Sequence, residues 1–277
     1  CNLATEEYRL DVSPLGVTIS GGGYGAVFNA LQTLFQLLPA SVYSKRGFEK
    51  VELPYCTIKD SPRYPHRGFM LDVCRTWMDK ESVMEYIDLL AYHKINSFRL
   101  HLTDDEAWRI EIKAFPELTT VGGIGCYSDS KAPARFYTQD EIREILAYAA
   151  ERHIEVIPEI DMPGHASAFN RVMPALKGND RTVNPGKEET FTTLKTIYSE
   201  LANLFPGRYI HIGGDEVNKN GWDNLPEVKA LMEKEGLKSL NEVEEYFCRR
   251  LADIITSLGK NVVAWDDLID SGTSPEG

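Results

Sequence analysis

The residues with the clearest chemical potential in this sequence are two adjacent carboxylates, Asp215 and Glu216. They follow the run 209–214, Tyr-Ile-His-Ile-Gly-Gly, which predicts a buried strand with a tight turn at its end. Neighbouring residues at a strand end point in different directions, so the two carboxylates can act on different atoms of one ligand. Repulsion within a close carboxylate pair favours a proton on one member, as a general acid requires. The alternative is an ordinary helix start, where acidic residues are also common.

Other ionisable and aromatic side chains recur where predicted strands end. They are Asp72 with Arg75, Asp104 with Asp105, Glu159 with Asp161 and His165, and Trp265 with Asp266. A guanidinium can make paired hydrogen bonds to neighbouring sugar hydroxyls, although Arg75 can equally form a structural ion pair with Asp72. The three acids at 104–106 repel one another unless something organises them, which favours a functional site. Magnesium or calcium binding is the rival interpretation of these acids.

Two further side chains suit a ligand site built from strand ends. His165 follows Pro163 and Gly164, and a histidine held by a carboxylate on such a rigid turn can orient or tune a catalytic acid. An ordinary loop histidine is the alternative. Trp265 ends the fifth predicted strand, and indole faces stack on the apolar faces of sugar rings. Trp222 is less informative, because it can simply cover a loop.

The elements that must position these residues alternate between strand and helix after residue 63. Apolar runs predict strands at 67–73, 97–103, 154–160, 209–214 and 262–267, with helices near 81–93, 139–152, 190–204 and 240–258. Strand–helix alternation indicates a parallel sheet, either a (β/α)8 barrel or a doubly wound sheet. We favour the barrel, because the chemical side chains recur at the carboxyl ends of the strands. Only five strands can be identified, so we expect a truncated barrel.

The first 60 residues have a different pattern, that of a small α+β unit. Strands are predicted at 7–12, 15–20 and 51–58, and apolar residues at helical spacing between Val27 and Leu38 predict one helix. A unit of this size is marginally stable alone. We therefore expect residues 1–60 to be the C-terminal part of a larger α+β domain. Residues 61–277 are then the N-terminal part of the barrel.

Composition and missing motifs exclude several classes of function. The formal net charge of −12 argues against a non-specific grip on nucleic acid. No apolar run approaches ~18 residues, so we expect no transmembrane helix. The five scattered cysteines predict neither a zinc site nor a disulfide framework. No serine-hydrolase elbow, phosphate loop or dinucleotide fingerprint is present, and we expect no cofactor.

Four motifs together resemble one known family. They are His-Arg-Gly-Phe-Met-Leu-Asp-Val-Cys-Arg at 66–75, Leu-His-Leu-Thr-Asp-Asp-Glu-Ala-Trp-Arg at 100–109, Glu-Ile-Asp-Met-Pro-Gly-His at 159–165, and His-Ile-Gly-Gly-Asp-Glu-Val at 211–217. In this order they resemble the family 20 glycoside hydrolases, which are β-N-acetylhexosaminidases. The resemblance covers most of 63–267, and the preceding α+β piece looks like the end of the family's non-catalytic N-terminal domain.

The resemblance implies a (β/α)8 barrel that removes terminal β-linked GlcNAc or GalNAc with retention of configuration. The family is an exception to the two-carboxylate scheme of glycosidases, because the substrate's own 2-acetamido oxygen is the nucleophile. Carried over by position, the resemblance implies that Glu216 is the general acid and then the base, and that Asp215 orients the acetamido N–H. It implies that Arg75 holds the 3- and 4-hydroxyls of the sugar and that Trp265 forms a wall of the acetamido pocket. Asp104 and His165 would form the network behind Glu216.

The chain also departs from the family pattern. The family closes its pocket with a Tyr and an Asp, and then a Trp and a Glu, from its last strands, and none of these can be identified before residue 277. Another pocket aromatic is expected near 240–258, where Tyr246 or Phe247 could serve. We therefore expect the chain to be a fragment that is itself inactive, taken from an active enzyme. The roles of Asp105 and Glu106 stay open.

Three other interpretations compete with an exo-acting β-N-acetylhexosaminidase. A non-catalytic carbohydrate-binding relative would keep the barrel without turnover. A chitinase-like endo-enzyme would use the same acetamido chemistry, but its Asp-x-x-Asp-x-Asp-x-Glu pattern is absent. A metal-dependent hydrolase would be sensitive to a chelator. The resemblance implies an amino-sugar glycan as the substrate and an extracytoplasmic place of action.

Overall fold

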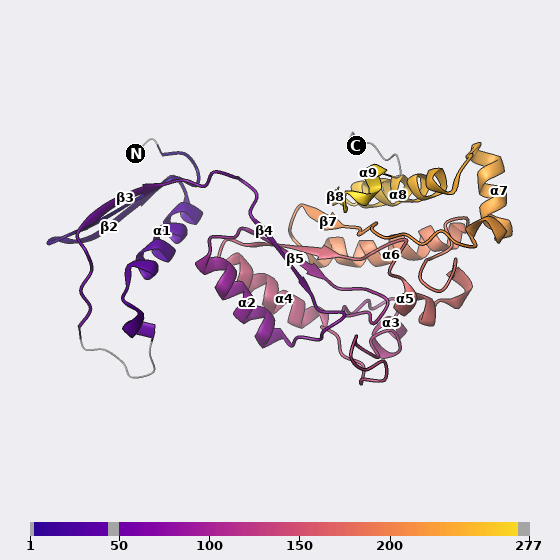
Figure 1. The fold of residues 1–277 in the computed structure, drawn as a ribbon, viewed down its shortest axis with the longest axis horizontal. Helices are drawn as coiled ribbons and strands as arrows, with labels where there is room; N and C mark the ends of the chain where they lie inside the picture. The colour runs from indigo at the N-terminus through magenta and orange to yellow at the C-terminus, as the bar shows by residue number, and fades with distance from the viewer. Residues whose placement is uncertain (1–2, 44–49, 271–277) are drawn as a thin grey trace. The chain divides into compact units, whose positions relative to one another are not determined.

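The computed structural model describes residues 3–43 and 50–270 (Figure 1). The chain separates into two compact units. The first unit comprises Cys1–Phe69, Glu81–Phe98 and Ala147–Glu155, and the second comprises Met70–Lys80, Arg99–Leu146 and Val156–Gly277. No helix within the described ranges combines the length and apolarity that crossing a membrane requires.

The first unit contains a three-stranded antiparallel sheet in the order β2-β1-β3. Its elements are β1 (Tyr8–Ser13), β2 (Gly16–Gly21), α1 (Tyr24–Leu37), the 3-10 turn η1 (Ala40–Tyr43) and β3 (Cys56–Asp60). Buried Tyr8 of β1 packs with Ala26 and Ala30 of α1, because alternate strand residues and one stripe of the helix face each other. The first two predicted strands and the helix are thereby confirmed.

The third predicted strand of this unit is only partly correct. The sequence predicts a strand at 51–58, whereas β3 begins at Cys56 and pairs with β1 from Val12↔Cys56 to Tyr8↔Asp60. Pro54 lies in the predicted stretch and has no backbone N–H to donate to a neighbouring strand. The apolar stretch before Cys56 therefore belongs to no strand, and the pairing with β1 begins at Cys56.

The second sheet has five strands in sequence order, β4-β5-β6-β7-β8 (Figure 1). They are β4 (Gly68–Asp72), β5 (Ser97–His101), β6 (Glu155–Glu159), β7 (Tyr209–His211) and β8 (Asn261–Val263). The pairings of β6 with β7 and of β7 with β8 are parallel. All five predicted strands are confirmed. The fold class is α/β with a parallel sheet, and the described residues supply five of the eight strands that a closed barrel needs.

Helices connect successive strands of this sheet. The long ones are α2 (Lys80–Tyr92), α4 (Gln139–Ala150), α6 (Glu188–Leu204) and α8 (Leu240–Ser257). Their positions match the prediction, because buried residues recur at helical spacing, as at Phe191, Leu194, Tyr198 and Leu201 of α6. Shorter elements were not predicted: α3 (Glu117–Thr120), α5 (Ser167–Val172), η2 (Pro174–Leu176), η3 (Trp222–Asn224), α7 (Pro226–Glu235) and α9 (Asp267–Asp270).

Two strands are shorter than their apolar runs suggest. The run at 209–214 forms a strand only to His211, since Gly213 and Gly214 have φ of +71° and +91° and leave the extended region. The run at 262–267 pairs only to Val263, so Trp265 lies just beyond the strand. These early strand ends leave the predicted site residues in turns at the carboxyl edge of the sheet.

Candidate active site

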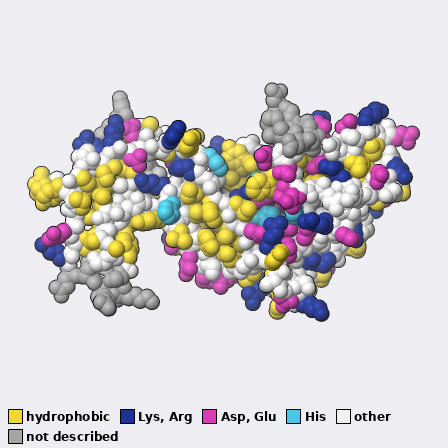
Figure 2. Space-filling view, viewed as in Figure 1, with side chains coloured by type: hydrophobic (Ala, Val, Ile, Leu, Met, Phe, Trp, Pro, Cys, Tyr) yellow, Lys and Arg dark blue, Asp and Glu magenta, His cyan; other side chains and the backbone are white. Residues whose placement is uncertain are grey.

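All six predicted site residues lie in the second unit, after the carboxyl ends of successive strands. Arg75 follows β4, Asp104 follows β5, His165 follows β6, Asp215 and Glu216 follow β7, and Trp265 follows β8. On one face of the molecule, Figure 2 shows acidic, basic and histidine side chains gathered close together. Ion pairs join Arg75, Asp104, His165, Asp215 and Glu216 into one cluster, and a backbone hydrogen bond to Gly213 ties Trp265 to it.

The acidic pair, Asp215 and Glu216, is presented by a turn that only glycine can make. A Cβ on Gly213 would overlap Oδ1 of buried Asp161, and the Gly214 N–H donates to the same oxygen over 3.0 Å. Glu216 itself has φ +49°, a left-handed conformation that is uncommon for a residue with a side chain. Backbone strain of this kind is typical of functional sites. The turn holds Glu216 with 70% of its side chain exposed, and Asp215 with 24%.

His165 lies between the acidic pair and a buried carboxylate. Its Nε2 is 3.6 Å from Asp215 Oδ2 and 3.7 Å from Glu216 Oε2, while its Nδ1 is 3.1 Å from Asp104 Oδ1. Burial alone would lower the pKa of His165, but hydrogen bonds to Asp104 and Asp105 raise it to about 11. The ring is therefore an imidazolium at neutral pH, and it places positive charge beside the acidic pair.

Asp104 is the centre of this arrangement, which we call the Asp104 network (Asp104, Arg75, His101 and His165). The buried carboxylate lies 2.7 Å from Arg75 Nη2, 3.0 Å from His101 Nε2 and 3.1 Å from His165 Nδ1. Burial would raise the pKa of Asp104, but the hydrogen bonds to the two histidines hold it well below its usual range. A buried charge persists only when it is paired in this way.

The two acids next to Asp104 have different surroundings, which the sequence left open. Asp105 is 2.6 Å from Arg181 Nε, and the Ser167 hydroxyl donates to it over 2.6 Å. Despite burial, hydrogen bonds to His165, Ser167 and Arg181 lower the pKa of Asp105 to about 2. For Glu106, burial and the charge of Asp104 raise the pKa. Asp105 therefore fixes the loop around His165, and it is occupied by protein partners.

Arg75 fits both of its predicted interpretations. It forms an ion pair with Asp72 at 2.9 Å in addition to its contact with Asp104, as the structural alternative requires. About 40% of its side chain is nevertheless exposed, so the guanidinium is still accessible to a ligand. The hydrogen bonds from the Cys74 and Arg75 backbone N–H groups to Asp72 Oδ1 fix the start of this loop. Its role in holding sugar hydroxyls stays a prediction.

Asp161 was identified at a strand end but not assigned to the site. It is fully buried, its Oδ2 has no hydrogen-bond partner among the described residues, and burial together with the charge of Asp215 raises its pKa well above the usual range. Oδ1 of Asp215 is likewise buried without a partner there. The available signal in the sequence was a carboxylate just after a buried strand, four residues before the predicted site histidine.

The structure places the uncertain aromatic candidates in the core. Phe247 is buried in α8 with its ring centroid 5.2 Å from that of Phe191, and Tyr246 packs against the same ring from 6.4 Å. Trp222 is fully buried and donates its Nε1–H to the Thr182 hydroxyl over 2.8 Å. Phe247 therefore packs in the core, Tyr246 is partly buried beside it, and Trp222 covers a loop, as its alternative interpretation predicted.

Carboxylates and histidines of the site also approach each other closely enough to hold a metal ion. Asp104, Asp105 and His165 are one such group, and Asp161, His165 and Asp215 are another. In the first group the carboxylates already face the guanidinium groups of Arg75 and Arg181 at 2.7 and 2.6 Å. A cation in this first group would have to displace these positive charges, so the geometry there favours an ion-pair network over a metal site.

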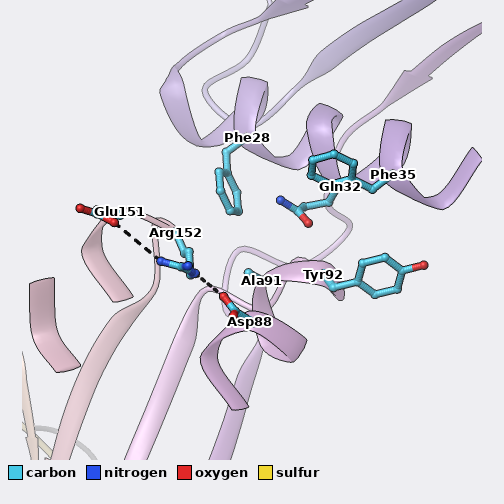
Figure 3. A pocket seen from close by; sticks show the side chains of 8 residues that line it. All are labelled: Phe28, Gln32, Phe35, Asp88, Ala91, Tyr92, Glu151 and Arg152. Atoms are coloured by element: carbon cyan, nitrogen blue, oxygen red, sulfur yellow. Dashed lines mark hydrogen bonds and ion pairs between the residues drawn. The ribbon is translucent and has the colours of Figure 1, made fainter. Parts of the chain in front are cut away.

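The first unit contains a separate pocket of about 450 Å³ (Figure 3). Phe28, Gln32 and Phe35 line it from α1, facing Tyr92 of α2 and the ion pair of Arg152 with Asp88 at 2.6 Å. Its lining includes none of the predicted site residues. The predicted chemistry therefore lies with the strand ends of the second unit rather than with this pocket.

Comparisons with known proteins point to one family. The model described as "Glycosyl hydrolase family 20, catalytic domain" matches residues 64–277, and "Glycosyl hydrolase family 20, domain 2" matches residues 1–61. A beta-hexosaminidase of Porphyromonas gingivalis is 40% identical over 99% of this chain and 37% of its own length. One of Vibrio furnissii is 37% identical over 94% of this chain and 45% of its own length. The chain thus spans half or less of these relatives.

Solved structures agree in fold. The exo beta-N-acetylglucosaminidase of Vibrio harveyi, solved in complex with N-acetylglucosamine, superposes with a TM-score of 0.89 and 36% identity, covering 96% of this chain and 44% of that chain. A beta-N-acetylhexosaminidase of Bacteroides fragilis gives 0.86 and 36%, covering 96% and 54%. The sheet and its connections are therefore those of this structural family, and the predicted fold class is confirmed.

Proposed function

Because the chain belongs to glycosyl hydrolase family 20, we propose that this protein is an exo-acting, retaining β-N-acetylhexosaminidase that removes terminal β-linked GlcNAc or GalNAc from extracytoplasmic glycans. One observation carries the proposal: the acidic pair lies beside the cationic ring of His165, at 3.6 and 3.7 Å, with Asp215 Oδ1 buried and unpaired among the described residues. The Asp215 side chain is still 24% exposed, so the carboxylate is accessible to a donor on the substrate.

The two members of the acidic pair divide the chemistry between them. Asp215 accepts a hydrogen bond from the acetamido N–H, which aims the acetamido oxygen at the anomeric carbon. The carboxylate also offsets the positive charge that develops on the acetamido group. As that oxygen bonds to the anomeric carbon, the glycosidic bond breaks and Glu216 protonates the leaving oxygen. Glu216 then takes a proton from water, which attacks the same carbon and reopens the oxazolinium ring. Two inversions give net retention, and the enzyme ends in its starting protonation state.

The surrounding residues bind and orient the sugar. Arg75, partly exposed and fixed by Asp72 and Asp104, donates to the 3- and 4-hydroxyls. Asp104 holds His165 as an imidazolium, and the imidazolium holds the acidic pair in place. Trp265 provides an apolar wall for the acetamido methyl group. These assignments need no bound metal.

We test the function by hydrolysis of an aryl β-N-acetylglucosaminide beside the matching β-glucoside. The assay uses the 277-residue chain and a longer chain that continues beyond residue 277. We expect cleavage of the N-acetyl sugar only, and only by the longer chain, because five strands do not close the barrel. Cleavage of neither sugar would favour a non-catalytic carbohydrate-binding relative, and loss of cleavage with a chelator would favour a metal-dependent hydrolase.

Asp215→Asn separates acetamido orientation from general catalysis. The amide can no longer stabilise the positive charge that develops on the acetamido group, so cleavage of the N-acetyl sugar should slow by about 10²- to 10³-fold. Any residual glucosidase activity should change little, because that substrate lacks the group Asp215 contacts. Equal slowing of both sugars would remove the orienting role from Asp215.

A further inference from the structure

Arg99 is a charged residue in the middle of a buried strand. Its neighbours in β5, Phe98 and Leu100, are fully buried, and strand alternation places Arg99 on the opposite face, the same face as His101. Only 16% of the Arg99 side chain is exposed. A guanidinium in such a position must be paired, and its partners show what it does.

The partners of Arg99 come from each of the next three strands or their ends. Its Nε is 3.4 Å from Oε2 of buried Glu159 at the end of β6, and its Nη1 contacts Nε2 of His211 at the end of β7. The guanidinium carbon lies over the Trp265 ring, 3.9 Å from the ring centroid. Arg99 is therefore anchored by β6 and β7 and covers one face of the indole that follows β8.

The other contacts of Trp265 involve its backbone and the ring of His211. Its backbone N–H donates to the Gly213 carbonyl over 3.0 Å, and its ring meets the His211 ring edge-on with centroids 5.7 Å apart. The guanidinium of Arg99 lies over the flat face of the indole. Planar guanidinium groups stack on aromatic faces, so this contact fixes the plane of the ring as well as its distance.

We propose that Arg99 is a positioning residue that sets the plane of the Trp265 indole and thereby the size of the acyl group that the acetamido pocket accepts. This inference rests on the proposed function, because it takes Trp265 as the wall of that pocket. Trp265 is only partly buried, so part of the indole is accessible to a ligand while Arg99 lies over the ring. The strand contacts of Arg99 also join the wall to the turn that carries the acidic pair.

Acyl-size selectivity is the property that should respond to Arg99. A firmly held wall rejects an N-propionyl group, which is one methylene larger than N-acetyl, and such discrimination typically amounts to ~10- to 200-fold. Arg99→Met keeps much of the side-chain volume but removes the stacking cation and its anchors. The indole can then tilt away, so we expect the preference for N-acetyl over N-propionyl substrate to fall by about tenfold.

The experiment compares kcat/KM for aryl N-acetyl- and N-propionyl-β-glucosaminides in the full-length enzyme and its variants. Arg99→Lys should recover part of the preference, because the cation returns without the planar fork. Arg250→Met is the matched control: Arg250 also lies over an aromatic ring, 4.1 Å from Phe191, and pairs with Glu188 at 2.7 Å. It should lose some thermal stability and leave the acyl preference unchanged.

Trp265→Ala completes the design as a double-mutant cycle. We expect Trp265→Ala to lower the N-acetyl preference, and Arg99→Met to lower it no further in that background. If Trp265→Ala changes the preference while Arg99→Met reduces both substrates equally, Arg99 is merely structural and the inference is wrong. An unchanged preference in Trp265→Ala also overturns it, with the hexosaminidase activity intact. Absence of N-acetyl cleavage by the parent enzyme would instead remove the proposed function and this inference together.

Discussion

Two groups of carboxylates lie close together in the second unit, and their surroundings are opposite. Asp104 and Asp105 are each met by several protein partners, among them Arg75, His165 and Arg181, at 2.6 to 3.1 Å. In the acidic pair, by contrast, Asp215 Oδ1 has no hydrogen-bond partner in the described parts of the chain, and 70% of the Glu216 side chain is exposed. Carboxylates of the first kind stabilise the shape of the site, and those of the second kind are available to a ligand.

The physical basis of this difference is the cost of burying charge. A carboxylate taken out of water must be paired with a cation or donor, and removal of one partner leaves the other buried and uncompensated. Substitutions in the paired group should therefore reduce stability, whereas substitutions in the acidic pair should reduce turnover with little loss of stability. The following experiments test that division.

Glu216→Gln should have the largest effect on the reaction. Removing the general acid and base lowers kcat by about 10²- to 10⁴-fold, most for substrates with poor leaving groups, which depend most on protonation. Because the side chain is exposed, the thermal midpoint should change little. Glu233→Gln, at an exposed position of α7, is the control and should affect neither quantity. Unchanged turnover in Glu216→Gln would exclude Glu216 as the acid.

Asp104→Asn should show the reverse balance, with stability lost first. The amide leaves Arg75, His101 and His165 without their shared anion, and breaking a buried ion pair typically costs about 3–5 kcal/mol. Chemical denaturation of the full-length protein measures the change in the free energy of unfolding. Asp180→Asn is the comparison, since that carboxylate is exposed and forms a surface ion pair with Lys177 at 2.6 Å. Equal losses in both variants would contradict the distinction between paired and available carboxylates.

The sequence predicts the strands and helices that carry this site better than the contacts between its side chains. Strand and helix positions follow from apolar periodicity, and the six chosen residues could be placed because polar side chains at the carboxyl ends of parallel strands share one edge. The two uncertain pocket aromatics, Tyr246 and Phe247, could not be placed, because an apolar residue on a helix looks the same whether it packs in the core or lines a pocket. The proposed boundary between the domains near residue 60 stays a prediction.

The contacts themselves depend on neighbours that are far apart in the sequence. Asp105 is fixed by Arg181, and Arg99 reaches across neighbouring strands to His211, separations of 76 and 112 residues that no local pattern encodes. Arg99 and His101 did leave a signal, as polar residues inside a predicted buried strand. Such residues need partners, but the sequence does not say which. The sequence also contains a signal for helix α7, because Pro226 stands at its start and Gly236 follows its end.

Gly213→Ala tests the turn that separates the paired carboxylates from the acidic pair. Gly213 has φ +71° and no room for a Cβ beside Asp161, whereas Gly236 has φ +72° and open space around it. Both substitutions carry the left-handed penalty of roughly 1–2 kcal/mol, and only Gly213→Ala adds the overlap. The difference between the two losses of unfolding free energy isolates that overlap. Equal losses would mean that the turn relaxes around the methyl group.

The charge of His165 should also make stability depend on pH. The pKa of His165 is about 11 in the folded state against an ordinary value of 6.5, so the folded protein keeps a proton that the unfolded chain loses. The resulting stabilisation is complete below about pH 6.5 and is lost as pH rises through about 11, with a slope of at most ~1.4 kcal/mol per pH unit. The free energy of unfolding of the parent protein should therefore be lower at pH 9 than at pH 7, and this difference should be smaller in His165→Gln.

His101, whose pKa is about 10, contributes in the same direction, so part of the pH dependence should remain in His165→Gln. His93→Gln, at an exposed position, should retain the full slope, and identical slopes in all three proteins would mean that His165 is not the cation that stabilises the Asp104 network.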